Sequence, residues 1–352
     1  MLIAEGIKSD HLLLPIIKRP ARCKIALVAA PTLKKLKDLI LFSRSYLTLK
    51  KAAFQRNVVR ILSAISLKCN ARPQTTKELS PHEAKNFLPH CFASLTCWMQ
   101  NENVVNRFGL KFFEPGKNAL DLSGVPGKIE AKERCFFDEQ TGLTAVILQS
   151  QDDKVFLCFG GVRSGDTIQA MDPAMRFKVL WRQRISAVKN LFGFKVGIYQ
   201  QADALYQTLK QKKEFAGKKV ILTGQSLGGS IASYVSAKNH VPSVCFNSIA
   251  LGVRQQREIG EKNLLNAHEY VTHISAKGDF FNNYPLFNPA DSVLRAIGIC
   301  TPRNFGQKYQ IPSAFEGLKK THYFILGSMM HHLGYDPRAG SDALKEDDLI
   351  LP

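Results

Sequence analysis

Residues 220–237 read VILTGQSLGGSIASYVSA and place Ser226 inside a Gly-x-Ser-x-Gly motif. A run of branched apolar residues leads into the motif, and a helix-forming segment follows it. This strand–turn–helix context is what a nucleophile elbow requires, because the tight turn exposes the serine oxygen. We expect Gly224, Gly228 and Gly229 to remove side chains where the turn and helix pack closely, and Ser226 to adopt a sparsely populated backbone conformation. The pattern favours a nucleophile over a serine in an ordinary loop.

A nucleophilic serine needs a base, and the base needs an acid that orients it. In folds that carry this motif, the order along the chain is serine, acid and then histidine. Asp279 follows the strand-like stretch YVTHISAKG and is the predicted acid. Asp291, deeper in the following loop, is its rival, and ordinary turn chemistry is the other interpretation of Asp279.

Three histidines follow Asp279 and could serve as the base. We predict His322, because it lies beyond the last expected strand and at the start of a helix, where its ring could reach the strand ends. His332 is the alternative. It and His331 lie at the far end of that helix, roughly 14 Å away at the helical rise, where the pair could instead cap the helix. His273, inside an expected strand, is interpreted as a core or sheet-face residue.

An acyl-transfer site also needs donors for the oxyanion of the tetrahedral intermediate. One donor is expected to be the backbone N–H of Leu227, which follows the serine, and the other should come from the loop after an earlier strand. The segment VFLCFGGVRSGD supplies such a loop, and Gly160 and Gly161 would permit close backbone approach. A simple turn is the alternative interpretation.

The elements that must position these residues alternate between strands and helices from about residue 134 onward. Strands are expected around the turns EQTG and QDDK, then at AGKKVILTG, PSVCFNSIALG, EYVTHISAKG and KYQIP, with helices at 196–215, about 254–267 and from about 322. Alternation of this kind predicts an α/β fold with a mainly parallel sheet covered on both faces. Upstream, residues 80–99 are expected to form a helix capped by Ser80, preceded by a polar linker at 70–83.

Charge divides the 352-residue chain unevenly. The net charge is +19, and residues 1–80 hold sixteen Lys/Arg against four Asp/Glu, which leaves a net +12 in this segment. Its apolar residues recur at helical spacing between the cations, so we expect a helical basic extension at 1–80 and a hydrolase domain at 81–345. The extension could pack on the domain, contact an anionic membrane surface peripherally, or contact nucleic acid. Nucleic acid is the least favoured, because aromatic residues are sparse there.

The eight cysteines form no Cys-x-x-Cys pair, and several lie in apolar strand-like runs. Free buried thiols are therefore expected, with no metal site and no organic cofactor. Free thiols favour a reducing compartment, and the first residues mix acids and bases into apolar stretches, unlike a cleaved signal peptide. We expect a cytoplasmic protein, or one delivered without a cleaved signal peptide, with peripheral membrane association as a possible variant. No apolar run reaches the roughly 20 residues of a membrane span.

Residues 130–335 resemble the class 3, fungal-lipase-like family of the α/β-hydrolase superfamily. KVFLCFGGVRSGD resembles that family's strand and FRG[TS] oxyanion segment, and VILTGQSLGGSIASYVSA is similar to its TGHSLGGALA stretch. The resemblance implies a three-layer α/β-hydrolase sandwich and a lipase-like ester hydrolase. It places Val162 as the second oxyanion donor beside Leu227. The pattern HHLGYD faintly resembles a histidine motif of fungal members, which keeps His332 as the alternative base.

Two residues depart from the family pattern. Gln225 replaces the usual histidine before the serine, and because this is not a triad position we expect the replacement to cost little. Val162 lacks the hydroxyl that a threonine or serine would add, which would cost about 2–4 kcal/mol of transition-state stabilisation if nothing replaces it.

The sequence thus predicts a serine hydrolase of carboxylic esters, with lipid or phospholipid acyl esters as substrates and Ser226, His322 and Asp279 as the triad. A catalytically inactive hydrolase fold that serves as a binding or effector module is the alternative, as is a thioesterase or acyltransferase with the same serine. Residues 164–194 could form a lid over an acyl pocket or a plain amphipathic core helix.

Overall fold

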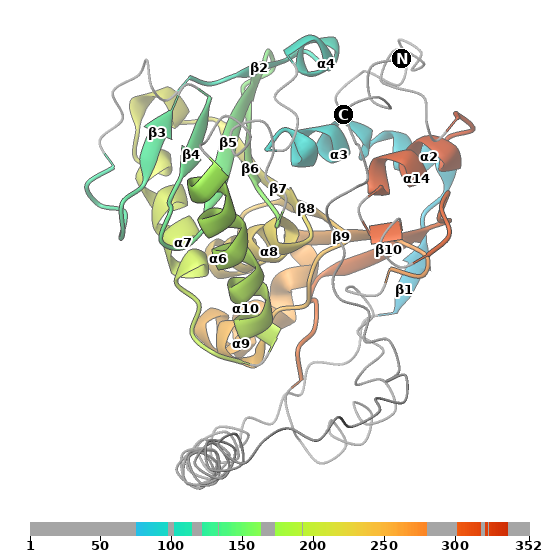
Figure 1. Ribbon diagram of the computed structural model, residues 1–352. Helices are drawn as coiled ribbons and strands as arrows, with labels where there is room; N and C mark the ends of the chain where they lie inside the picture. Colours follow the sequence, from blue (N-terminus) through green and yellow to red (C-terminus); the bar gives the residue numbers. More distant parts are fainter. Residues whose placement is uncertain are drawn as a thin grey trace, which may run out of the picture. The chain divides into compact units, whose positions relative to one another are not determined.

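Ten strands of the described part of the chain form one sheet (Figure 1). The structure is a computed structural model that describes the following residues, all within the compact unit Cys69–Pro352: 75–97, 102–114, 122–132, 134–162, 173–191, 193–279, 301–317, 321–322 and 324–336. The predicted basic extension, except for residues 75–80, lies outside the described residues, as does Asp291.

Strands and helices alternate along most of this unit. The strands are β1 (Thr76–Glu78), β2 (Leu110–Phe112), β3 (Glu130–Lys132), β4 (Cys135–Phe137), β5 (Thr144–Ser150), β6 (Lys154–Phe159), β7 (Lys219–Gln225), β8 (Ser243–Phe246), β9 (Val271–Ala276) and β10 (Gln307–Ile311). The helices are α2 (Pro81–Lys85), α3 (Leu88–Leu95), α4 (Glu102–Arg107), α6 (Pro173–Leu191), α7 (Gly197–Lys210), α8 (Leu227–Asn239), α9 (Val253–Ile259), α10 (Glu261–Leu265) and α14 (Ile325–His332), with short 3-10 turns at Lys213–Phe215 and Asn266–Glu269.

The strand order is β1-β10-β9-β8-β7-β6-β5-β4-β3, and β2 pairs with β5. In this spatial order, the neighbouring pairs that run from β1 through β10, β9, β8 and β7 to β6 are all parallel. The remaining pairs are antiparallel: β6 with β5, β5 with β4, β4 with β3, and β5 with β2. The sheet is therefore mixed. Because β6 to β10 run in one direction, their carboxyl ends meet at one edge of the sheet, where a parallel sheet offers a site.

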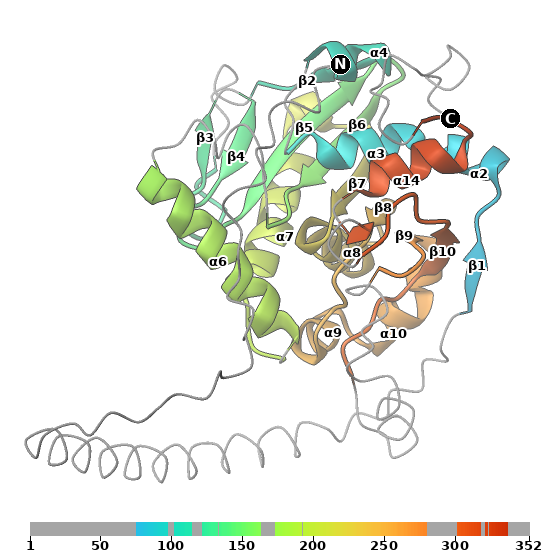
Figure 2. The ribbon, with the colours of Figure 1, turned by 45° about the vertical axis from the view of Figure 1, so that its right-hand side comes forward.

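Side chains that alternate along the strands pack into two separate hydrophobic cores, one on each face of the sheet. In β6, Val155, Leu157 and Phe159 belong to one apolar cluster, whereas Phe156 and Cys158 belong to the other. Helices α7 and α8 pack in the first cluster, and α3 and α14 lie side by side in the second (Figures 1 and 2). A mixed sheet between two helical layers fits an α/β-hydrolase-like fold.

The N-terminal part of this unit differs from the sequence-based expectation. Residues 80–99 form two helices, α2 and α3, rather than one, although Ser80 caps α2 with a capping box as predicted. Residues 76–78, expected in a linker, form β1 and pair with β10 at the sheet edge. The expected helix at 254–267 is likewise divided, because Gly260 (φ 87°) separates α9 from α10.

Cysteines in the described part are free and buried, as predicted: Cys91, Cys97, Cys135, Cys158 and Cys245. Burial raises the pKa of Cys158 and Cys245 to about 12, so both remain neutral thiols. Across the described residues, we find no helix with the combined length and apolar character needed to cross a bilayer.

Candidate active site

Ser226 stands at the turn between β7 and α8 in a strained backbone conformation. Its φ and ψ are 58° and −121°, a region that side chains rarely allow. Three backbone hydrogen bonds hold it there: its N–H donates to Phe246 O at 3.0 Å, and its carbonyl accepts from Ser230 N at 3.1 Å and Ile249 N at 3.2 Å. The sparsely populated conformation predicted for an elbow serine is confirmed, and β8 supplies the support for it.

The glycines around Ser226 are required by close packing. A Cβ on Gly228 would lie 2.1 Å from Phe159 O, and one on Gly224 would lie 2.5 Å from the carbonyl carbon of Gly228. A Cβ on Gly229 would lie 2.5 Å from the side-chain oxygen of Ser248. Strand β6, the elbow and α8 therefore approach more closely than any side chain permits, which confirms the packing role expected of these glycines.

Ser226, His322 and Asp279 form a continuous chain of hydrogen bonds. His322 Nε2 lies 2.8 Å from Ser226 Oγ, and His322 Nδ1 lies 2.8 Å from Asp279 Oδ1. Ser226 follows β7 and Asp279 follows β9, so both stand beyond the same edge of the sheet. The exposed fractions of Ser226, His322 and Asp279 are 4%, 2% and 1%. Little water reaches these contacts, which strengthens them, and the arrangement can accept a proton from the serine hydroxyl.

The backbone that carries His322 is held by two amide side chains from neighbouring strand ends. Gln225 Nε2 donates to His322 O at 2.7 Å, and Asn247 Nδ2 donates to the same oxygen at 2.9 Å and to Thr321 O at 2.9 Å. Asn247 Oδ1 in turn accepts from Ala276 N at 2.9 Å, at the end of β9. These contacts hold the backbone from which the imidazole ring reaches Ser226 and Asp279.

Sequence reasoning missed both amide residues. Gln225 was expected to be a replacement that costs little, and no contact was assigned to it, yet its side-chain amide donates to the carbonyl oxygen of His322. Asn247 directly follows β8 and has φ 41°, a conformation that asparagine tolerates better than most residues. The sequence signals only that an asparagine follows a buried strand at the edge where Ser226 and Asp279 were placed, and not which groups its side chain contacts.

The two predicted oxyanion donors follow adjacent strands. Leu227 is the first residue of α8, where helix N–H groups lack intrahelical partners. Val162 lies three residues beyond Phe159, which pairs in register with Gly224 in the parallel β6–β7 pair. Both residues therefore stand beyond the same edge of the sheet as Ser226. Their oxyanion role stays a prediction.

No protein-family model matches the sequence, and no curated protein matches it. Among solved structures, the chain is similar to a lipase from Rhizopus microsporus var. chinensis, at 13% identity and a TM-score of 0.36, over 79% of this chain and 94% of that one. It is also similar to a mono- and diacylglycerol lipase from Aspergillus oryzae, at 14% identity and a TM-score of 0.33, over 69% of this chain and 84% of that one.

The other histidines considered from the sequence have different surroundings. His332, the alternative base, directs Nε2 to Leu79 O at 2.7 Å, and His331 is exposed on α14. His273 is buried, with Nδ1 3.2 Å from Ser248 Oγ and Nε2 3.0 Å from Phe305 O, in agreement with a core role. The structure thus brings His322, rather than His332, to Ser226.

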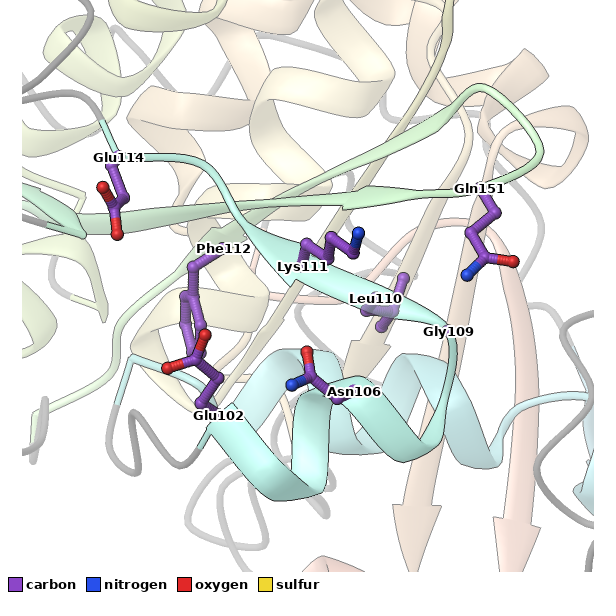
Figure 3. Close-up of a pocket in the computed structure, with 8 residues that line it drawn as sticks. All are labelled: Glu102, Asn106, Gly109, Leu110, Lys111, Phe112, Glu114 and Gln151. Carbon is purple, nitrogen blue, oxygen red and sulfur yellow. The ribbon is translucent and has the colours of Figure 1, made fainter.

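A pocket of about 500 Å³ lies apart from these residues, between α4 and β2 (Figure 3). Gln151, which lines it, follows β5, and β5 runs antiparallel to β6. The pocket therefore lies toward the amino ends of the parallel strands, at the edge opposite Ser226. Glu102 on its wall already pairs with Arg134 at 2.7 Å.

Within the described residues, no three His, Cys, Asp or Glu side chains gather as a metal site.

Proposed function

We propose that this protein is a serine hydrolase of carboxylic esters, with lipid acyl esters as its substrate class. The observation that carries the proposal is the chain of two 2.8 Å contacts from Ser226 through His322 to Asp279. An ordinary loop serine has no need of a strained backbone or of an imidazole that is itself oriented by a carboxylate.

In this proposal, neutral His322 carries its proton on Nδ1, and this N–H donates a hydrogen bond to Asp279. Nε2 accepts the hydroxyl proton of Ser226 while Oγ attacks the acyl carbon. Asp279 stabilises the resulting imidazolium without taking the proton. His322 then protonates the leaving alcohol, and a water molecule activated in the same way releases the acid from the acyl-enzyme.

The oxyanion of each tetrahedral intermediate would be held by the backbone N–H groups of Leu227 and Val162. The N-terminus of α8 adds the positive end of the helix dipole at that position. Because the valine side chain offers no hydroxyl, only its backbone could contribute a hydrogen bond.

Lipid acyl esters are proposed as substrates because the elbow and the glycine loop resemble those of class 3 lipases. Thioesters and acyl acceptors other than water remain the alternatives, since they use the same serine chemistry. A substrate panel separates them: acyl esters of increasing chain length, phospholipids, acyl thioesters, and esters offered together with an alcohol acceptor.

Variants test the assignment on whichever ester is turned over fastest. Ser226→Ala and His322→Ala should each lower kcat by about 10⁴-fold or more, and Asp279→Asn by about 10⁴-fold. His332→Ala is the matched control and should retain wild-type kcat. If His332→Ala abolished turnover while His322→Ala did not, the proposed base would be wrong. A folded wild-type chain that turned over no substrate of the panel would instead favour an inactive hydrolase fold with a binding role.

A further inference from the structure

Helix α6 exposes large apolar side chains along one face. Phe177, Trp181 and Val188 have exposed fractions of 66%, 51% and 53%. Their spacing of four and seven residues places them within one narrow stripe of a helix. The rings of Phe177 and Trp181 are stacked, with centroids 6.3 Å apart. We call these three residues the α6 outer face. An exposed apolar stripe of this kind marks an interaction surface.

The charged residues of α6 itself all have one sign. The helix sequence contains five Lys or Arg and no Asp or Glu. Exposed cations on it are Lys178, Arg182, Arg184 and Lys189. Lys178 pairs with Glu139 at 3.1 Å. A helix that joins exposed aromatic residues to cations has the composition of helices that lie in a membrane interface.

The opposite face of α6 is fixed to the rest of the fold. Gln183 Nε2 donates to Gly142 O at 2.9 Å. Asn190 Nδ2 donates to Ala250 O at 2.7 Å, and Asn190 Oδ1 accepts from Gly252 N at 2.9 Å. Helix α6 lies in front of the sheet in Figure 1 and at the edge of the described part in Figure 2. These bonds hold α6 by its inner face, so its outer face is the one left exposed.

We propose that the α6 outer face docks the protein on an anionic lipid surface. Phe177 and Trp181 enter the boundary between headgroups and acyl chains, and Arg182, Arg184 and Lys189 lie among the anionic headgroups. Charge argues against the chain's own segment 1–80 as the occupant, because its net +12 would repel a face of the same sign. Docking needs no ester hydrolysis, so it can be measured separately from the proposed reaction.

The first test follows Trp181 itself. The chain has two tryptophans, so Trp98→Phe leaves Trp181 as the only one, and Ser226→Ala prevents hydrolysis of the vesicles. We expect the emission of Trp181 to shift to the blue with vesicles of phosphatidylcholine and phosphatidylserine, and bromine-labelled acyl chains to quench it. Vesicles of phosphatidylcholine alone should give a much smaller shift. Unchanged Trp181 emission while the protein sediments with anionic vesicles would overturn the proposal, since another part would then be the contact.

The second test removes the apolar stripe. Phe177→Ser combined with Trp181→Ser should weaken sedimentation with the anionic vesicles by about tenfold or more. Leu265→Ser, at a residue 44% exposed on α10, is the matched control and should leave binding unchanged. Equal losses in the two variants, both folded by circular dichroism, would contradict the proposal.

The third test removes charge at one site. Replacing Arg182, Arg184 and Lys189 with Gln should lower binding by about a hundredfold at low salt. Lys210, Lys213 and Lys219 are exposed lysines outside α6, and their triple Gln variant removes the same net charge. Equal losses would mean that only net charge matters and would overturn the proposal. So would Trp181-dependent binding of a single-stranded oligonucleotide in the absence of vesicle binding, which would assign the face to nucleic acid.

Discussion

Ser226 depends on a backbone conformation that a side chain disfavours. Conformations of this kind cost on the order of 1–3 kcal/mol and persist only where the surroundings impose them. Here the end of β8 and Ile249 supply the constraint through backbone hydrogen bonds. The position of the serine oxygen is therefore a property of the neighbouring strand as much as of the motif.

Relief of this strain should be measurable. We expect Ser226→Gly to raise the free energy of unfolding by about 1 kcal/mol relative to Ser226→Ala, because glycine adopts positive φ without steric cost. Urea unfolding of the two variants measures the difference. Ala204→Gly, inside α7, is the control for glycine's entropy and should destabilise by about 1 kcal/mol relative to Ala204. A Ser226→Gly protein less stable than Ser226→Ala would contradict the strain.

Asn247 should act as a positioning residue for His322. Asn247→Asp replaces the donor that faces Thr321 O and His322 O with a carboxylate oxygen, which these carbonyls repel. We expect kcat to fall about tenfold or more with KM little changed. Asn247→Gly tolerates the same φ and carries no carboxylate, so it should recover part of the kcat that repulsion costs the Asp variant.

A purely structural role for Asn247 would give a different result. The Asp variant would then unfold more easily while the folded fraction kept its wild-type kcat. Asn263→Asp, at a partly exposed asparagine on α10, is the matched control and should leave kcat unchanged.

The residues of the site differ in how far the sequence reveals them. Ser226 is marked by its motif, and Asp279 and His322 follow from the order expected after it, although the choice between His322 and His332 required the structure. Asn247 and Gln225 could not be assigned, because their role is a contact with backbone carbonyls of a segment about 75 or more residues away. Such contacts leave no local pattern.

At the level of elements, the elbow is a junction of β6, β7 and α8 with no room for another carbon atom. Gly228→Ala would place a Cβ 2.1 Å from Phe159 O, and backbone must move to accommodate it. We expect a loss of about 2–4 kcal/mol in the free energy of unfolding, together with loss of turnover. Gly197→Ala is the matched control, because its Cβ would meet only Thr141 Cγ2 at 3.7 Å. Equal stabilities for the two variants would contradict the packing.

Strands and helices with a strong hydrophobic pattern were predictable from the sequence, whereas elements with a weak pattern were not. Strands β4 to β9 follow apolar runs whose residues are buried on both faces. Strand β1 has three exposed residues and no alternation, so it depends on pairing with β10. The division between α2 and α3 was missed because apolar residues continue through it. The break after α9 does have a signal in the sequence, which is Gly260. Glycine is the residue that commonly ends a helix, because it adopts positive φ, as it does here.

For the molecule as a whole, two buried histidines should make the fold sensitive to acid. Burial lowers the pKa of His90 to about 4 and that of His273 to about 3, with smaller effects from nearby lysines. Both are neutral in the folded state, whereas in the unfolded chain they protonate near 6.5. As pH falls from about 6.5 toward 4, the unfolded state therefore binds more protons, and stability decreases.

The expected slope from these two groups approaches about 2.7 kcal/mol per pH unit near the middle of that window, at about pH 5, before His90 begins to be protonated in the folded state as well. Urea unfolding at a series of pH values from about 7 down to about 5 measures this dependence of the unfolding free energy on pH. His90→Phe retains the ring that packs edge-on against Phe156 and should roughly halve the slope contributed by the pair. An unchanged slope in His90→Phe would show that His90 is protonated in both states or in neither.

The most direct test of the proposed chemistry is labelling of the intact protein with a fluorophosphonate, read out by mass spectrometry of its peptides. We expect a single adduct on Ser226 in the wild type, strong suppression in His322→Ala, and an unchanged yield in His332→Ala. A folded wild-type protein that takes up no label, or takes it up at another residue, would contradict a nucleophilic Ser226 activated by His322.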